Sequence, residues 1–312
     1  MSLRLCAVLG LVLTMHASPA LNVQAQQVDQ STAPGDERVI VPGTAEEAIK
    51  NFVGEIAATT SRSENQLARW SQAICPSMVG MRADHAQLVI DRIGRRAMEI
   101  GLGIGEPTCK PGILIIVSRE PDRVAQGLFD NYKRRLGYYA TSAKTLGRDA
   151  LKDFVKSTAP VRWWHVNYTV SADGDQPTGN KLPPGLGVQE NTSSPMMASR
   201  HPSRILRATR QDAGMAFLIV DARRIEGMDL MALADYLAMV SLGQLDQKAD
   251  TSAYPTILNL FDQHPAENST PASMTEWDIG YLTGVYSMTR ESGSAARQQA
   301  EIAKRMSKDL SN

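Results

Sequence analysis

The sequence has no excess of charge of either sign. Lys plus Arg number 33 and Asp plus Glu number 33, so the formal net charge over the 312 residues is zero. A strongly basic chain would favour nucleic acid or an anionic membrane surface as its partner. The balanced charge gives no reason to expect either, and we predict no nucleic-acid partner.

The chain also lacks a long hydrophobic run beyond its N-terminus, and crossing a bilayer takes about 20 apolar residues. At the N-terminus, Arg4 precedes an apolar run from Leu5 to Met15, and small residues lead to a cleavage site near Ala25. This pattern is typical of a secretory signal peptide covering residues 1–25. Cys6 precedes the apolar run, which disfavours a lipoprotein. The sequence predicts a periplasmic or secreted protein with no transmembrane segment after the leader is removed.

Several motifs that carry chemistry are missing. There is no G-x-S-x-G nucleophile turn and no G-x-x-x-x-G-K-[ST] phosphate loop. "GLGIGE" at 101–106 follows a predicted helix and precedes a predicted strand, the reverse of the order in a dinucleotide-binding turn. The four histidines beyond the leader have no metal-ligand spacing: His85, His165, His201 and His264. We therefore expect no cofactor and no metal site.

Cysteine is scarce, and Cys75 and Cys109 are the only two beyond the leader. "ICPSMVGM" reads as a strand, "ADHAQLVIDRIGRRAMEIG" as a helix and "GILIIV" as a second, buried strand. Parallel strands of such a βαβ unit start at the same edge of the sheet, where the cysteines lie. In an oxidising compartment we predict a structural disulfide worth about 4 kcal/mol.

The rest of the chain predicts one globular domain over residues 44–312, preceded by a flexible segment at 26–43 and containing a long loop at 172–202. Thr44 followed by Glu47 indicates the start of a helix. The fold class is α/β or α+β, a mixed sheet with an N-terminal βαβ unit and flanking helices. The remaining predicted elements are helices at 120–139 and 142–158, a strand at 161–170, a hairpin turning at Ala213–Gly214, a buried helix at 229–245, and helices around 274–288 and 295–310.

"YLAMVSLGQLD", residues 236–246, resembles the zinc-binding helix of metzincin proteases, H-E-x-x-H-x-x-G-x-x-[HD]. Gly243 and Asp246 match, whereas Tyr236, Leu237 and Val240 stand where the histidines and glutamate would be. Downstream, "YPTILNLFDQ" and "MTEWDIGYLTGVYS" resemble the turn and closing helix of that family. The resemblance implies a zincin-like fold without zinc ligands, with packed side chains at 236, 237 and 240 and no metalloprotease activity. The alternative is an ordinary core helix that ends near a glycine.

The layout of the chain also resembles a group of uncharacterised secreted proteins of Gram-negative bacteria, which implies no activity. We predict a non-catalytic protein that binds a peptide, a glycan or an envelope protein. Its groove would be formed by Tyr236 and Asp246, with Arg162, Trp163 and His165 of "RWWHV" as further candidates.

Two alternatives stay open. One is a hydrolase with a dispersed active site, for which His165, Asp221 and Asp246 would have to converge. The other is a structural envelope component that uses its C-terminal helix as an interface. In that helix, Ile302, Met306 and Leu310 form an apolar stripe at helical spacing, and we expect the stripe to pack on the domain itself.

Overall fold

A computed structural model describes residues 44–59, 66–139, 143–175, 207–262 and 271–311. The predicted leader, the predicted flexible segment and most of the predicted 172–202 loop lie outside these residues. Residues 43–312 form one compact unit. No helix in the described part combines the length and the apolar character needed to cross a membrane.

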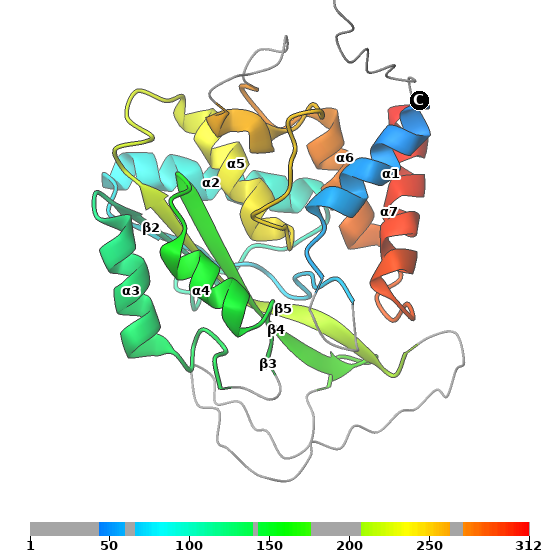
Figure 1. The fold of residues 1–312 in the computed structure, drawn as a ribbon, viewed down its shortest axis with the longest axis horizontal. Helices are drawn as coiled ribbons and strands as arrows, with labels where there is room; N and C mark the ends of the chain where they lie inside the picture. Colours follow the sequence, from blue (N-terminus) through cyan, green and yellow to red (C-terminus); the bar gives the residue numbers. More distant parts are fainter. Residues whose placement is uncertain (1–43, 60–65, 140–142, 176–206, 263–270, 312) are drawn as a thin grey trace, which may run out of the picture. The chain divides into compact units, whose positions relative to one another are not determined.

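The described chain contains helices and strands in alternation, which confirms the mixed α/β class (Figure 1). The strands are β1 (Pro76–Val79), β2 (Ile113–Ser118), β3 (Ala143–Lys144), β4 (Val161–Ser171) and β5 (Thr209–Asp221). The helices are α1 (Ala45–Ile56), α2 (Ala83–Glu99), α3 (Pro121–Tyr132), α4 (Arg148–Lys156), α5 (Leu230–Leu242), α6 (Glu276–Ser287) and α7 (Ala295–Leu310), with a 3-10 helix η1 (Ile257–Phe261).

The five strands form one sheet in the order β1-β2-β5-β4-β3. β1, β2 and β5 are parallel, while β4 is antiparallel to β5, and β3 pairs only with Asn167 and Tyr168 of β4. The predicted βαβ unit is confirmed as β1-α2-β2. Cys75 and Cys109 form the predicted disulfide, with their Cα atoms 6.0 Å apart.

Helices cover both faces of the sheet, as Figure 1 shows. Alternate strand residues such as Ile115 and Leu218 face the larger core, which α1, α2, α5, α6 and α7 share. The residues between them, such as Trp164 and Phe217, face a smaller core under α3 and α4. This alternation follows from the two-residue repeat of a β-strand.

The predicted hairpin at Ala213–Gly214 is wrong, because both residues lie inside the single long strand β5. The glycine serves close packing instead of a turn. A Cβ atom at Gly214 would lie 1.8 Å from Cε2 of Tyr168 on β4. The β4–β5 register also shifts between Val166 and Asn167, which pair with Met215 and Ala213 and leave Gly214 as the extra residue of a bulge in β5.

Helix α5 is buried on its whole circumference from Ala232 to Leu242, as its apolar sequence predicts. Asp229 caps its start by accepting hydrogen bonds from the backbone N–H groups of Met231 and Ala232 at 2.6 and 3.0 Å. Tyr236, Leu237 and Val240 all pack in the core, which confirms the expectation of packing at these positions.

The C-terminal helix α7 packs on α6 and α1. Ile302 and Met306 are fully buried and Leu310 is partly buried against the same core. The apolar stripe of this helix is therefore used inside the domain, as expected, and is not available as an interface.

Candidate functional site

The structure does not bring the five residues of the predicted groove together at one surface. Arg162 is buried on the face of the sheet that α3 and α4 cover, where it donates to Asp122 Oδ1 at 2.6 Å and to the carbonyl oxygen of Val155 at 3.1 Å. Trp163, His165 and Tyr236 are buried on the opposite side, toward α5. Only Asp246 is exposed.

Trp163 and Tyr236 are part of the packing around α5. Their rings meet edge to face with centroids 6.5 Å apart, and the ring of Phe261 lies 5.0 Å from that of Tyr236. The indole N–H of Trp163 donates to the carbonyl oxygen of Leu245 at 3.1 Å. Burial raises the pKa of Tyr236. These two aromatic side chains hold the end of α5 against the sheet and offer no open surface to a ligand.

His165 is buried beside the end of α5, and this environment keeps it neutral. Burial lowers its pKa to about 4, against a smaller opposing effect of a backbone hydrogen bond with Ser241. The strand register places His165 opposite Ala216, five residues before Asp221, a separation of roughly 17 Å along β5. Asp221 itself accepts hydrogen bonds from Arg223. The structure does not bring His165 and Asp221 together as the dispersed hydrolase requires.

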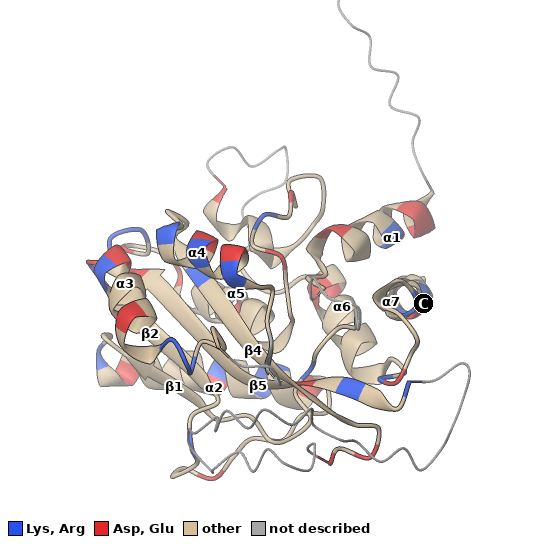
Figure 2. Cartoon of the chain, turned by 60° about the horizontal axis from the view of Figure 1, so that its bottom comes forward, with Lys and Arg blue, Asp and Glu red and all other residues tan. Residues whose placement is uncertain are grey.

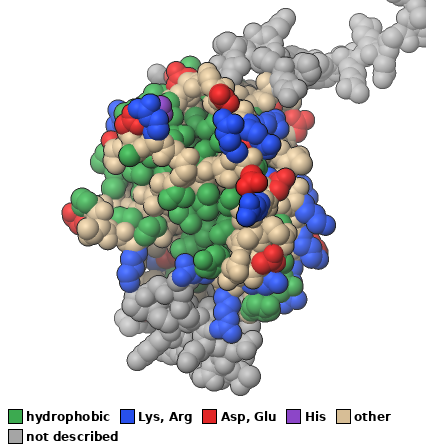
Figure 3. Space-filling view, turned by 90° about the vertical axis from the view of Figure 1, so that its left-hand side faces the viewer, with side chains coloured by type: hydrophobic (Ala, Val, Ile, Leu, Met, Phe, Trp, Pro, Cys, Tyr) green, Lys and Arg blue, Asp and Glu red, His purple; other side chains and the backbone are tan. Residues whose placement is uncertain are grey.

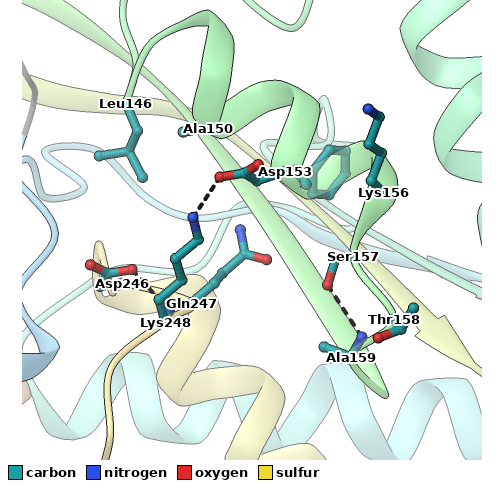
Figure 4. Close-up of a pocket in the computed structure, with 11 residues that line it drawn as sticks. Leu146, Ala150, Asp153, Lys156, Ser157, Thr158, Ala159, Asp246, Gln247 and Lys248 are labelled. Atoms are coloured by element: carbon teal, nitrogen blue, oxygen red, sulfur yellow. Dashed lines mark hydrogen bonds and ion pairs between the residues drawn. The ribbon is translucent and has the colours of Figure 1, made fainter.

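Asp246 lies at a pocket of about 690 Å³ between α4 and the segment that follows α5 (Figure 4). Leu146, Ala150 and Phe154 form the apolar part of its wall, while the end of α4 continues into the turn before β4. The full lining is Leu146, Ala150, Asp153, Phe154, Lys156, Ser157, Thr158, Ala159, Asp246, Gln247 and Lys248. Its volume is in the range of small-molecule and cofactor sites.

Two basic and two acidic side chains surround this pocket. Lys248 Nζ lies 2.6 Å from Asp153 Oδ2, so an ion pair joins α4 to the segment after α5 across the pocket (Figure 4). The hydrogen bond with Asp153 raises the pKa of Lys248. Asp246 accepts the backbone N–H of Lys248 at 2.9 Å, which fixes the turn that carries both residues. Lys156 completes the set on the α4 side.

The pocket lies beside an edge of β4 that has no neighbouring strand in the described part of the chain. β3 pairs only at Asn167 and Tyr168, so Val161 to Val166 pair with β5 alone. Pro160 O accepts from Asp221 N, so by alternation the backbone groups of Trp163 point away from β5. The side-chain amide of Gln247 donates to the carbonyl oxygen of Trp163 there.

Sequence patterns gave little indication of this pocket. Asp246 was predicted as a groove residue, but Asp153 and Lys156 read as ordinary polar positions of an amphipathic helix. Lys248 is 95 residues from its partner Asp153. The one local signal is the mixed charge of "DQKAD" directly after the apolar helix α5.

A second surface feature is a set of exposed hydrophobic side chains. Val79 at the end of the edge strand β1 and Leu88 on α2 are 49% and 47% exposed. Figure 3 shows one face of the molecule on which hydrophobic side chains gather between charged ones. Large exposed apolar areas are typical of interaction surfaces.

Within the described residues, no group of three or more His, Cys, Asp or Glu side chains is arranged to hold a metal ion. His201 and His264 lie outside those residues. The pocket lining contains neither His nor Cys. No family model, no curated protein and no solved structure matches this chain.

Proposed function

We propose that the protein is an extracytoplasmic, non-catalytic binding protein that holds a short peptide segment of a partner in the pocket between α4 and residues 246–248. The observation that carries this proposal is the open pocket of about 690 Å³ with an apolar wall and charges of both signs around it. The signal-peptide pattern at residues 1–25 supports a periplasmic or secreted location.

The side chains in the pocket favour a peptide over a glycan. Sugars bind on exposed aromatic faces, but Trp163, Trp164 and Tyr236 are all buried. A peptide offers an amide backbone, apolar side chains and charges of both signs. These fit the unpaired edge of β4, the Leu146–Phe154 wall, and the Asp153 and Lys248 side chains. A peptide backbone at this edge would replace the hydrogen bond from Gln247 to Trp163.

The chemistry of the pocket supports binding without catalysis. Lys248 is paired with Asp153, and Ser157 uses its hydroxyl oxygen to accept the backbone N–H of Ala159 at 3.2 Å. The ion pair raises the pKa of Lys248 and so favours the protonated amine, which has no lone pair for nucleophilic attack. The zincin-like origin also stays a proposal. It is supported by the sequence resemblance and by the succession of a buried strand, the helix α5, η1 and α6.

Selection from short random-sequence peptides tests the proposal, with a glycan array as the parallel probe. Ala150 is partly exposed on the pocket wall and borders the smaller core, so Ala150→Trp adds bulk to the pocket, and its urea unfolding is compared with that of the wild type to check that the fold is kept. We expect peptides selected on the wild type to bind Ala150→Trp at least about tenfold more weakly, a change of about 1.4 kcal/mol in binding free energy.

Lys304→Trp is the matched control, because it adds the same side chain at an exposed position on α7, away from the pocket lining. It should bind the selected peptides as the wild type does. Equal binding by Ala150→Trp and wild type would place the peptides elsewhere. If the wild type binds a glycan and Ala150→Trp does not, the ligand of the pocket is a sugar and not a peptide.

A further inference from the structure

Three arginines converge at the end of the β4–β5 pair that is remote from the peptide pocket. Arg69 lies in the segment before β1, Arg210 is the second residue of β5, and Arg290 follows α6. Asp212 accepts hydrogen bonds from Arg210 Nε at 3.1 Å and from Arg290 Nη2. Figure 2 shows basic and acidic positions close together on the ribbon in this part of β5.

Arg69 is held in a fixed orientation beside this pair. Its backbone carbonyl accepts the N–H of Ala213 at 2.9 Å, and Nη1 donates to the carbonyl oxygen of Val285 at 2.8 Å. Its guanidinium lies over the ring of Tyr286, 5.8 Å from the centroid, and the Tyr286 hydroxyl donates to Leu242 O at 2.8 Å. Orientation in advance of binding lowers the entropy lost when a ligand is bound.

The guanidiniums keep N–H groups that no described residue accepts. Arg290 Nε is buried and has no hydrogen-bond partner within the described chain. Arg69 uses Nη1 for Val285, and no acceptor for its Nε or Nη2 is found among the described residues. A guanidinium carries five N–H donors, so the cluster has several to offer to one acceptor group.

The positive charges of the cluster repel one another. Within the described residues, the carboxylates that act on it are Asp212, which is hydrogen-bonded to Arg210 and Arg290, and Glu291, which acts on Arg69 and Arg290. Burial, followed by the positive charge of Arg290, lowers the pKa of Arg69 to about 10. Burial also lowers the pKa of Arg290. One added negative charge would relieve this repulsion.

We propose that Arg69, Arg210 and Arg290 form a binding site for a small oxyanion, a carboxylate, phosphate or sulfate group. The planar forks of arginine match the paired oxygens of such groups, and Arg69 and Arg290 supply the donors that are not already used. The site is separate from the peptide pocket and does not depend on the function proposed for it.

Thermal unfolding in inorganic phosphate, sulfate or acetate, each compared with chloride at equal ionic strength, tests this site. Binding to the folded state raises Tm with ligand concentration, by about 3 °C at a tenfold excess over Kd. We expect this rise for the wild type and its loss in Arg69→Gln. A rise in Tm with phosphate and sulfate but not with acetate would identify a tetrahedral oxyanion as the ligand. An equal rise with acetate would identify a carboxylate.

Arg224→Gln is the matched control, since Arg224 is exposed just beyond the opposite end of β5, and it should keep the full rise. Should Arg69→Gln fail to fold, Arg69→Lys serves instead, because it keeps the cation but loses the fork, and it should bind phosphate at least about tenfold more weakly by calorimetry. No rise in wild type with any of the three anions would overturn the proposal. An equal rise in wild type and the Arg69 variants would overturn it as well.

Discussion

Asp235 and Asp278, both in the described part of the chain, are completely buried, and their surroundings differ in one respect. Asp235 on α5 is surrounded by cations, whereas Asp278 on α6 is surrounded by neutral donors. Both carboxylates have their hydrogen bonds satisfied, as buried polar groups require. The comparison shows what a positive charge adds to a site that is already hydrogen-bonded.

Asp235 accepts two hydrogen bonds from each of Arg92 and Arg96 on α2, at 2.7 to 2.9 Å. The backbone N–H of Met274 adds a further one at 2.9 Å. Burial acts to raise the pKa of Asp235, but the hydrogen bonds from Arg96 and Arg92 outweigh it and hold the pKa at about 2. The carboxylate therefore ties α2, α5 and the segment before α6 together as an ion.

Asp278 accepts the backbone N–H groups of Ile257 and Thr275, each at 2.8 Å, and the hydroxyl of Thr256. With Thr275 it forms a capping box at the start of α6, and it also anchors η1. No cation hydrogen-bonds to it, and burial raises its pKa above the usual range for aspartate. The same side chain thus serves as an ion pair in one place and as a helix cap in the other.

The largest expected effect is that of Asp235→Asn, which removes the buried counterion that Arg92 and Arg96 share and leaves Arg96 only the exposed Glu99. Breaking a buried ion pair on one side costs about 3–5 kcal/mol, and we expect this loss in the free energy of unfolding measured with urea at neutral pH. Asp84→Asn removes the partner of Arg82 at an exposed site and should leave stability unchanged. A loss no larger than that of the control would contradict the assigned role.

The pKa values of Asp235 and Asp278 shift in opposite directions, so the two residues should affect the pH dependence of stability in opposite ways. The folded pKa of Asp235 is depressed, so its contribution is complete above pH 3.8 and disappears as the pH falls through about 2. The pKa of Asp278 is raised in the folded state. Its contribution to the free energy of unfolding is therefore complete below pH 3.8 and decreases as the pH rises through the folded pKa.

His165 extends the comparison to a buried base without a charged partner. Its folded pKa of about 4 lies below the ordinary 6.5, so the folded state favours the neutral ring. Stability from this group is complete above pH 6.5 and is lost as the pH falls toward 4, by about 3 kcal/mol. We expect His165→Gln to remove this part of the pH dependence in urea unfolding. A variant with an unchanged slope between these pH values would show that His165 does not titrate as a buried base.

The smallest of the three effects should come from Asp278→Asn. Oδ2 of Asp278 accepts both backbone N–H groups, so an amide oxygen at this position keeps them, and the amide nitrogen replaces Oδ1 as the neighbour of the Thr256 hydroxyl. We expect a loss of about 1–2 kcal/mol in the free energy of unfolding, smaller than for Asp235→Asn because no buried cation is left alone. Urea unfolding of both variants under one condition tests the order. A greater loss for Asp278→Asn than for Asp235→Asn would contradict the conclusion that the cations make Asp235 the more stabilising of the two carboxylates.

The sequence predicted well wherever neighbouring residues decide the structure. The βαβ unit, the buried α5 and the cap at Thr44 depend on periodicity and on contacts a few residues apart. The hairpin at Ala213–Gly214 failed because a glycine in a strand can mark either a turn or a close approach. Only the position of Tyr168 on the neighbouring strand distinguishes the two.

The candidate sites were predictable only in part. Arg162, Trp163 and His165 are polar or amphipathic residues that suggest a surface, yet pairing of β4 with β5 and cover by helices on both faces bury all three. Asp246 is exposed at the pocket, but nothing near it in the sequence identifies Asp153 as the partner of the adjacent Lys248. Side-chain chemistry is visible in a sequence, whereas exposure depends on what packs above it.

By itself, the sequence determined the mixed α/β class, the disulfide and the absence of zinc ligands on α5, because these depend on residue type and local spacing. Tertiary structure alone decided that Arg92 meets Asp235, 143 residues away, that Lys248 meets Asp153, and that Arg69, Arg210 and Arg290 converge. Such pairs carry no signal along the chain, since each partner satisfies its own local pattern equally well as a solvated residue. Only the packing of elements distant in sequence brings the partners within hydrogen-bond distance.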